Sequence, residues 1–388
     1  QRVVHGGLRY LQHGDLKRMR ESIRERSTLL RNAGHLVEPM PFLVPTYGLG
    51  MRGKPAMFTA MKLNDLISAD RNKGLSKDRR LPNGRLINAN DCLKMAPGIE
   101  PDGLTGGAIF YDAQVNNSER LTLAVLQSAI KAGATAANHL RVTGINRDGE
   151  RVAGVSATDR FTGESIDIRA RLTLACAGPW TKKTAALYGD DRENTPTENF
   201  EVIRAVALVT RDLFDGMGIA IPSRKAHSDN KELISKGFRN LFVTSWRGQS
   251  LIGTFYSDYT DDPDNLSVTP DEIRGYVEEF NQAYPSANLR YDDVHYTFMG
   301  LQPKAAAPGN SPGGDGTQAS ADAEPVASKR YQLIDHALSE QLEGLITVLG
   351  VKWTTARDVA EKAVTLAAQK LGGPSVPCQT VNTRLHGA

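Results

Sequence analysis

Near its carboxyl end the chain has a short apolar run, residues 345–349, that stops at Gly350 and leads into a helical pattern. Five consecutive aliphatic and β-branched residues before a glycine are typical of a buried strand. Apolar residues then recur at helical spacing from Val359 to Ala367, and Thr355 with Asp358 predicts a capping box at the start of this helix. A buried strand joined to a capped helix indicates a fold of mixed α and β structure, in which free helix N–H groups face whatever lies beyond the loop. Taken alone, an ordinary βα connection with a surface lysine at Lys352 explains the same pattern.

A second strand ends in the same way. Residues 136–146, 151–158 and 165–175 alternate with turn clusters and predict a three-stranded meander. Its last strand runs into a Gly-Pro turn at residues 177–180 that must end the strand before another helix begins. A strand that stops at a glycine often lies against a ligand.

Further helices and strands follow from the apolar periodicity. We expect helices at residues 16–33, capped by Asp15 and ended by a left-handed Gly34, at 54–69, at 118–130 and at 270–283. Strands at residues 202–210, 241–245 and 251–255 suit a second sheet. Residues 39–103 are irregular and rich in Pro and Gly, so we interpret them as an insertion. Residues 306–328 are of low complexity and predict a flexible loop.

Composition excludes several classes of protein. The 388 residues are 40% hydrophobic and 23% charged, which supports a packed core, and a net charge of +3 is too small for a nucleic-acid-binding protein. The three cysteines predict no disulfide framework and no metal site, and they favour a reducing compartment. No apolar run approaches about 18 residues and no signal peptide opens the sequence. We expect a cytoplasmic protein and leave open a peripheral contact with the cytoplasmic membrane.

Residues 48–53 match the GxGxxG pattern of dinucleotide-binding loops, and Asp70 follows at about the distance of a ribose-binding acid. We reject this match, because Pro41 and Pro45 interrupt the segment that would have to form a central parallel strand.

The amino-terminal segment offers a further candidate site. His5 is followed by Gly6 and Gly7, which would let a flat ring approach the backbone, although a plain turn explains the pattern equally well. Arg9 and Arg330 are candidate anion contacts, because a guanidinium group pairs with phosphate through two hydrogen bonds.

Four motifs in this order resemble the signature of the FAD-dependent glycerol-3-phosphate dehydrogenases, within the wider group of D-amino-acid-oxidase-like flavoproteins. The similarity extends from residue 1 to about residue 370. The motifs are His5-Gly6-Gly7-Leu8-Arg9-Tyr10-Leu11, Ala177-Gly178-Pro179-Trp180, Ser250-Leu251-Ile252-Gly253-Thr254 and Gly350-Val351-Lys352-Trp353-Thr354-Thr355-Ala356-Arg357.

The resemblance implies a Rossmann-like flavin domain that lacks its first βαβ segment, together with a β-rich substrate domain. The flavin domain would combine residues 1–35, 104–200 and 335–388, and the substrate domain residues 36–103 and 201–334. The implied reaction is oxidation of sn-glycerol 3-phosphate to dihydroxyacetone phosphate, by hydride transfer to N5 of FAD, with quinone or oxygen as the final electron acceptor. The implied partners are thus a small phosphorylated substrate and an electron acceptor.

The resemblance also implies roles for individual residues. Residues near FAD would be His5, Gly6, Gly7, Val142, Ala177, Gly178, Pro179, Trp180, Gly350, Val351, Lys352, Thr354 and Thr355. Residues on the substrate side, and candidates for catalysis, would be Lys352, Arg9, Arg330 and Tyr256.

This sequence also departs from the family pattern. Well-known members have an Arg where this chain has Gln302 and a Thr-Asp pair where it has Phe255 and Tyr256. Lys304 or Tyr256 would then have to contact the anion or the hydroxyl group. Two alternatives therefore stay open: a flavin oxidoreductase for another small hydroxy or amino acid, and a non-enzymatic remnant or incomplete gene product.

We expect residues 1–388 to purify without tightly bound FAD. The sequence opens at Gln1, and we expect the family's opening strand and phosphate-binding loop to lie in missing upstream sequence. The pyrophosphate would then lack a helix N-terminus to neutralise it. Absorbance at the flavin bands of the purified chain tests this expectation, and a stoichiometrically yellow preparation would contradict it.

Overall fold

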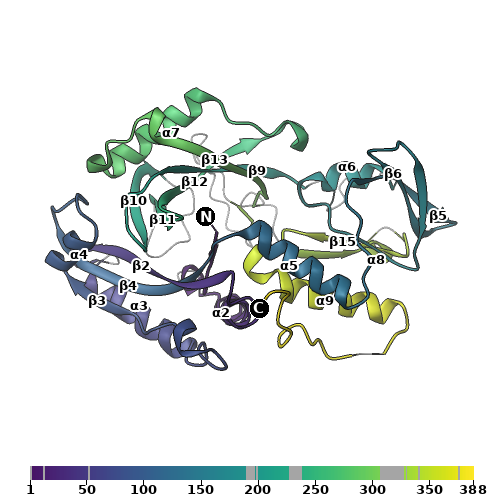
Figure 1. Ribbon diagram of the computed structural model, residues 1–388, viewed down its shortest axis with the longest axis horizontal. Coiled ribbons are helices and arrows are strands. Elements are labelled where there is room, and N and C mark those ends of the chain that lie inside the picture. The colour runs from purple at the N-terminus through teal and green to yellow at the C-terminus, as the bar shows by residue number, and fades with distance from the viewer. Residues whose placement is uncertain are drawn as a thin grey trace.

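The computed structural model describes residues 2–11, 14–50, 53–188, 197, 200–226, 238–305, 327–328, 330–339, 341–374 and 376–388. The fold mixes helices and strands, as the sequence predicted (Figure 1). The helices are α1 (Leu8–Leu11), α2 (Leu16–Asn32), α3 (Lys54–Ile67), α4 (Ala89–Met95), α5 (Ser118–Lys131), α6 (Thr181–Ala186), α7 (Pro270–Ala283), α8 (His336–Ser339) and α9 (Ala356–Lys370). The strands are β1 (Val3–Val4), β2 (Val37–Tyr47), β3 (Arg85–Asn88), β4 (Leu104–Val115), β5 (Leu140–Asp148), β6 (Arg151–Asp159), β7 (Ser165–Arg169), β8 (Thr173–Ala175), β9 (Val202–Arg211), β10 (Gly218–Ala226), β11 (Phe238–Trp246), β12 (Gln249–Tyr259), β13 (Val294–Pro303), β14 (Gln332–Asp335) and β15 (Leu345–Leu349).

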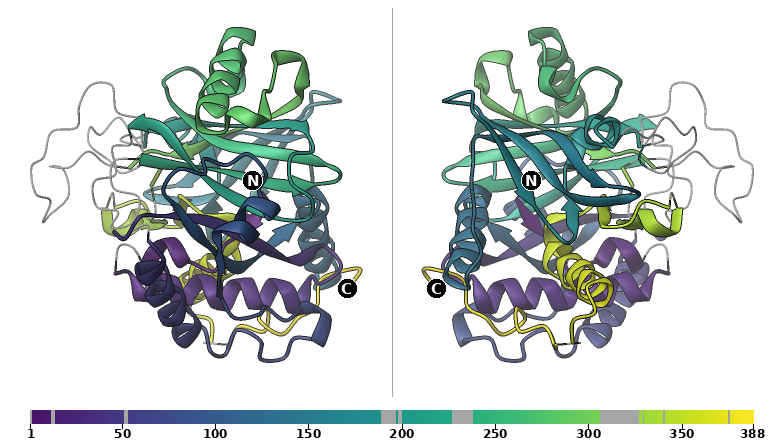
Figure 2. Two further views of the ribbon diagram at one scale, coloured as in Figure 1. Left: turned by 90° about the vertical axis from the view of Figure 1, so that its left-hand side faces the viewer. Right: turned by 90° about the vertical axis from the view of Figure 1, so that its right-hand side faces the viewer.

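A large curled sheet dominates the molecule. Its strand order is β1-β4-β2-β10-β11-β12-β9-β13, and β3 pairs with residues 106–109 of β4. Helices α4 and α7 cover one face, and the main hydrophobic core lies between them and the sheet, around Leu208, Ile252 and Phe280. Helices α2 and α5 enclose a second core against β1, β2 and β4. Figure 2 shows α7 above the large sheet and α2 below it.

Strand β2 corrects our interpretation of residues 39–103 as an irregular insertion. It pairs with β4 along its whole length, and Phe42 and Leu43 are buried in the middle of the large sheet. Its prolines stand at positions 39, 41 and 45. Backbone N–H groups of residues two apart point to the same edge of a strand, so all three missing N–H groups belong to one edge. At the edge away from β4, β10 pairs with β2 only at residues 42 and 43, so the prolines interrupt no ladder.

The predicted meander forms as the separate sheet β5-β6-β7, but its third strand is shorter than expected. Residues 165–169 pair with β6, whereas residues 173–175 form β8 in a different sheet. This second small sheet has the order β14-β15-β8, and β15 runs parallel to β8. The break separates a fully exposed segment, residues 165–169, from one that pairs with the buried strand β15.

Two predicted helix ends differ in the structure. Helix α2 ends at Asn32, and Gly34 is not left-handed; a Cβ there would lie 3.1 Å from the Leu30 carbonyl oxygen, so this glycine allows a close approach. At α9 the capping box is absent. Thr355 closes a 3-10 turn (Trp353–Thr355) and lacks the extended backbone of a capping residue, while Asp358 binds the Lys362 ammonium group at 2.6 Å.

The other predicted helices form within a few residues of their expected ends, and Asp15 caps α2 by accepting from the Arg18 N–H. The chain after α9 returns to α2, where the Asn32 amide donates to the carbonyl oxygens of Thr380 and Val381. Figure 2 shows this yellow segment beside the purple helix. The predicted flexible loop, residues 306–328, lies outside the described residues except for Ala327 and Ser328.

Candidate functional site

Two of the predicted loops leave the same edge of the small mixed sheet. Strands β8 and β15 are parallel neighbours, with Thr173 beside Leu345 and Ala175 beside Thr347. Because the carboxyl ends of parallel strands meet at one edge, residues 176–180 and residues 350–355 emerge side by side. The two loops that the sequence predicted after buried strands therefore lie at the same edge of this sheet.

The amino-terminal motif comes to the same region. The 3-10 turn 353–355 packs against α2, and the Lys352 ammonium group lies 5.9 Å from the centre of the Tyr10 ring. Helix α9 is tied to α2 by Arg357, whose Nη2 donates to Oε1 of the buried Glu25 carboxylate at 2.6 Å and whose Nε donates to Oε2 at 2.8 Å. This pair holds the beginning of α9, directly after the turn 353–355, against the middle of α2.

His5 follows β1, which pairs with β4, and the register brings His5 beside Asp112 of β4. The His5 Nδ1 atom lies 3.2 Å from Asp112 Oδ2, and the Gly6 N–H donates to Oδ1 at 2.6 Å. The His5 ring is half exposed, whereas the Asp112 carboxylate is buried. Arg26 of α2 contacts the same carboxylate.

The charge state of Asp112 follows from these contacts. Burial favours the neutral acid, but the Arg26 guanidinium, His5 and the Gly6 N–H together hold the pKa of Asp112 below its usual range. An ionised carboxylate only accepts hydrogen bonds, so the His5 Nδ1 must carry the proton of this bond. The other ring nitrogen, Nε2, is then the basic atom of a neutral His5.

Gly350 and Gly178 permit the two loops. Gly350 has φ +70°, and a Cβ there would lie 2.7 Å from the carbonyl oxygen of Arg330, so the predicted anion residue passes directly over this glycine. Gly178 has φ +55° and open space where a Cβ would stand. Side chains of other residue types would strain the backbone at both positions.

The Trp180 side chain points to the large sheet. Its indole Nε1 donates to Asp264 at 2.8 Å, in the turn after β12, and Lys183 donates to the same carboxylate at 2.8 Å. Arg141, next to the predicted contact Val142, approaches Asp264 at 3.9 Å. The meander and the turn at residues 177–180 thus share one partner, although Val142 itself lies in a separate sheet.

The remaining predicted residues lie elsewhere or are not described. Tyr256 lies on β12 of the large sheet, opposite Ala205 of β9. Lys304, considered as a replacement cation, forms ion pairs with Asp258 at 2.6 Å and Glu201 at 3.7 Å. Arg9 belongs to α1, and its side chain is outside the described part of the structure.

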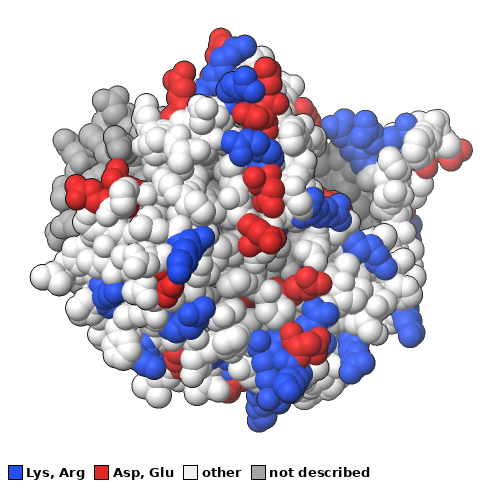
Figure 3. Space-filling model, turned by 60° about the vertical axis from the view of Figure 1, so that its left-hand side comes forward, with Lys and Arg blue, Asp and Glu red and all other residues white. Residues whose placement is uncertain are grey.

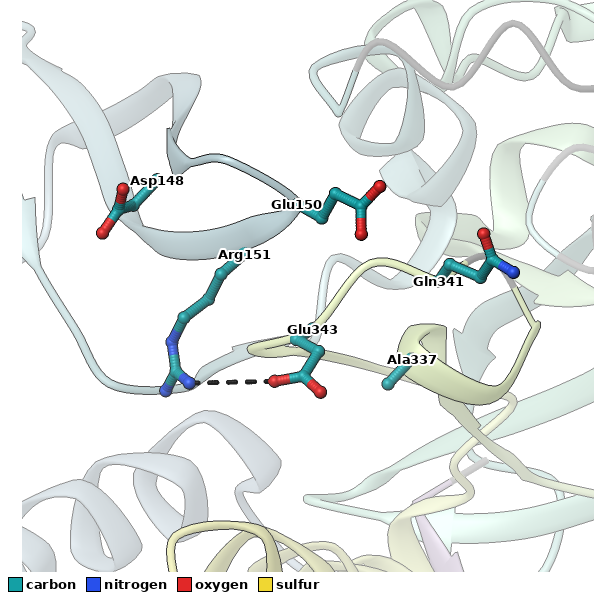
Figure 4. Close-up of a pocket in the computed structure, with 6 residues that line it drawn as sticks. All are labelled: Asp148, Glu150, Arg151, Ala337, Gln341 and Glu343. Carbon is teal, nitrogen blue, oxygen red and sulfur yellow. Dashed lines mark ion pairs between the residues drawn. The ribbon is translucent and has the colours of Figure 1, made fainter.

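Two surface hollows are lined by residues outside these loops. The one in Figure 4 lies between the β5–β6 turn and the segment around α8, and three of its six lining residues are carboxylates, which disfavours an anionic ligand there. Arg151 and Glu343 form an ion pair of 3.8 Å across it. The second hollow lies along α2 and includes the Glu25–Arg357 pair. Neither contains a predicted site residue.

The residues at the loop edge fit the flat isoalloxazine ring of a cofactor of the FAD type. Leu174, Val351 and Trp353 are 37%, 41% and 46% exposed, although large apolar side chains are usually covered. Open space lies beside Gly178, where a Cβ would meet no other atom within 4 Å. That these residues bind FAD stays a prediction.

Charge and hydropathy add two observations. On the face shown in Figure 3, acidic and basic side chains are interleaved, without a continuous basic surface. Among the described residues, no helix has the length and apolar character required to cross a membrane. The described residues likewise contain no cluster of three potential metal ligands.

Sequence reasoning missed Asp112, Arg26 and Glu25. Residues 24–26 form a charged run that suggests a solvated helix face, yet Glu25 and Arg26 are both buried. Their partners are 332 and 86 residues away in the sequence, so no local signal could have revealed these pairs.

Comparison with known proteins identifies the family of the chain. The family model for FAD-dependent oxidoreductases of the DAO type matches residues 1–331, so the chain belongs to this family. It is 30% identical over 392 residues to a glycerol-3-phosphate dehydrogenase of Synechocystis, covering all of this chain and 66% of that protein. An aerobic glycerol-3-phosphate dehydrogenase of Staphylococcus haemolyticus is 27% identical, with 63% covered, and a probable mitochondrial enzyme of Caenorhabditis elegans is 29% identical, with 49% covered. The chain thus spans about half to two thirds of the length of these relatives.

Solved structures share the fold. The glycerol-3-phosphate dehydrogenase of Bacillus halodurans, complexed with FAD, superposes with a TM-score of 0.69 at 22% identity, over all of this chain and 59% of that one. The L-alpha-glycerophosphate oxidase of Mycoplasma pneumoniae, with FAD bound, gives 0.56 at 14% identity, over 98% of this chain and 86% of that one. These likenesses support the flavoprotein fold inferred from the sequence.

The cysteines allow a test of the loop edge. Partial burial raises the pKa of the Cys176 thiol, but this residue is exposed at the end of β8, whereas Cys92 is fully buried and burial raises the pKa of its thiol to about 11. We expect maleimide to label Cys176 and to spare Cys92 in the folded protein. FAD at millimolar concentration should slow the labelling of Cys176, and Cys378 serves as the unprotected control. Equal labelling rates with and without FAD would contradict a cofactor at this edge.

Proposed function

We propose that this protein oxidises sn-glycerol 3-phosphate to dihydroxyacetone phosphate with FAD as the hydride acceptor. Membership of the DAO family supports the cofactor, and the names of its relatives support the substrate. The observation that carries the proposal is the contact of His5 with the buried Asp112.

Oxidation of a secondary alcohol removes a hydride from carbon and a proton from oxygen. Bound FAD supplies the hydride acceptor. His5 accepts the hydroxyl proton at Nε2, because its Nδ1 proton is held by Asp112. The arrangement of an imidazole oriented by a buried carboxylate is a general solution for a positioned base.

The phosphate requires cations at the other end of the substrate. Lys352 lies over Tyr10 in the loop after β15, and the backbone of Arg330 crosses Gly350 of the same loop. We assign the anion contact to Lys352 and Arg330, with Arg9 as a further candidate. Lys304 is a weaker candidate because Asp258 and Glu201 already neutralise it.

Quinone and oxygen are the proposed final electron acceptors, and a peripheral contact with the cytoplasmic membrane would suit a quinone. Another small hydroxy or amino acid is the second candidate substrate, since Gln302 stands where well-known members have an arginine. Bleaching of the flavin absorbance under anaerobic conditions, tested with a panel of hydroxy acids, amino acids and glycerol phosphates, separates the two. A scaffold without enzymatic activity would bleach with none of them.

The variant His5→Gln tests the proposed base. Glutamine retains a donor for Asp112 but cannot accept the substrate proton, so with FAD added to saturation we expect kcat to fall by about 10²- to 10⁴-fold while the affinity for FAD is kept. His386→Gln, at an exposed histidine of the carboxyl-terminal segment, is the matched control. Full turnover of His5→Gln would exclude His5 as the base.

The variant Lys352→Met tests the proposed cation. Methionine keeps the apolar stem and removes the charge, so folding should survive, and so should binding of FAD that is added to saturation. If Lys352 stabilises charge that develops during hydride transfer, kcat should fall by about 10²-fold or more; if it only anchors the anion, KM should rise alone. Lys131→Met, at the exposed end of α5, is the control. Unchanged kcat and KM would make Lys352 an ordinary surface residue.

A further inference from the structure

A buried pair of opposite charges lies beneath His5. Arg26 comes from α2 and Asp112 from β4, and each residue is only 3% exposed. Arg26 Nη1 contacts Asp112 Oδ1 and also donates to the Tyr111 carbonyl oxygen at 2.9 Å. Separating such a pair would leave a charge without a partner in the protein interior, which is costly.

Asp112 uses both oxygens in this arrangement. Oδ1 accepts from Arg26 and from the Gly6 N–H, and Oδ2 faces the His5 ring. The position of the carboxylate therefore determines both the backbone at Gly6 and the orientation of the imidazole. Arg26 in turn holds the carboxylate in place from the side opposite His5.

The Arg26–Asp112 pair also limits which residue type fits at position 6. A Cβ built at Gly6 would overlap the guanidinium carbon and Nη1 of Arg26, and it would lie 2.7 Å from Nη2. Gly6 does not have a positive φ, so its backbone does not demand glycine. The requirement for glycine at this position comes from the space that the guanidinium group occupies.

We propose that Arg26 is the positioning residue of the proposed base. It occupies the space above Gly6, fixes Asp112, and through Asp112 fixes the Nδ1 proton and ring orientation of His5. Gly6 is then a glycine because of Arg26, and the approach of a flat cofactor ring is not the reason. The inference rests on the proposed function only for the role of His5.

Gly7 provides a matched comparison within the same motif. Its φ is +83°, and a Cβ there would lie 3.0 Å from Met19 Cα and 3.1 Å from the Tyr10 ring. A side chain at Gly7 thus meets backbone strain and neighbours other than Arg26. Removing Arg26 should relieve a substitution at Gly6 and should not relieve one at Gly7.

The first experiment measures thermal unfolding of the protein without added FAD. We expect Gly6→Ala to lower Tm by about 5 °C or more, and to lower it by less than half as much in an Arg26→Met background, because methionine lacks the atoms that the new methyl group meets. Gly7→Ala should lower Tm equally in both backgrounds. If Arg26→Met alone does not fold, the background Arg26→Met with Asp112→Asn replaces it, since it leaves no unpaired charge.

The second experiment observes His5 directly. In protein labelled with ¹⁵N-histidine, the His5 signals, assigned by their loss in His5→Gln, should show a single tautomer protonated at Nδ1. Arg26→Met should give averaged signals of both tautomers, and Arg26→Lys should restore most of the wild-type spectrum. Arg20→Met is the control, since Arg20 pairs with the exposed Asp70.

Additive Tm losses for Gly6→Ala and Arg26→Met, or an unchanged His5 spectrum in Arg26→Met, would overturn the inference. Neither readout depends on turnover. A failure of the proposed activity would appear in the flavin bleaching experiment alone, so the two outcomes can be told apart.

Discussion

The contact between Arg26 and Asp112 unites the elements on which the candidate site depends. It joins α2 to the long strand β4, and β1 reaches the same carboxylate through the Gly6 N–H. A charged pair in the interior tolerates little displacement, because each partner needs the other to offset its lost hydration. The beginning of the chain is thus held at a defined place over the sheet. The buried Arg26–Asp112 pair therefore contributes more to the exact position of these elements than to the free energy of unfolding.

The second convergence comes from the parallel pairing of β8 and β15. It places the loops at residues 176–180 and 350–355 at one sheet edge, and the Glu25–Arg357 pair then brings that edge to α2. Sequence motifs separated by more than 300 positions therefore lie close together in the structure. The family match and the superposition with FAD-containing structures support the flavoprotein fold.

Much of the secondary structure could be predicted from the sequence, because apolar periodicity and turn residues are local signals. Helix α7 and strand β15 have their predicted ends. Strand β2 was missed because prolines usually exclude a central strand, and only its pairing partners show that they are harmless here. Part of the candidate site could be predicted, because the glycines and His5 belong to local sequence motifs. Arg26 and Asp112 are identified only by contacts across the fold.

The Glu25–Arg357 pair has a consequence for how the chain acquires its structure during synthesis. Its partners are 332 residues apart in the sequence. At a translation rate of about 5–20 residues per second, Arg357 is therefore synthesised roughly 20–60 s after Glu25. Throughout that interval α2 exposes a carboxylate that the finished protein buries. Helix α2 therefore cannot complete its packing until Arg357 has been made, and the segment that contains α2 has to remain soluble until then.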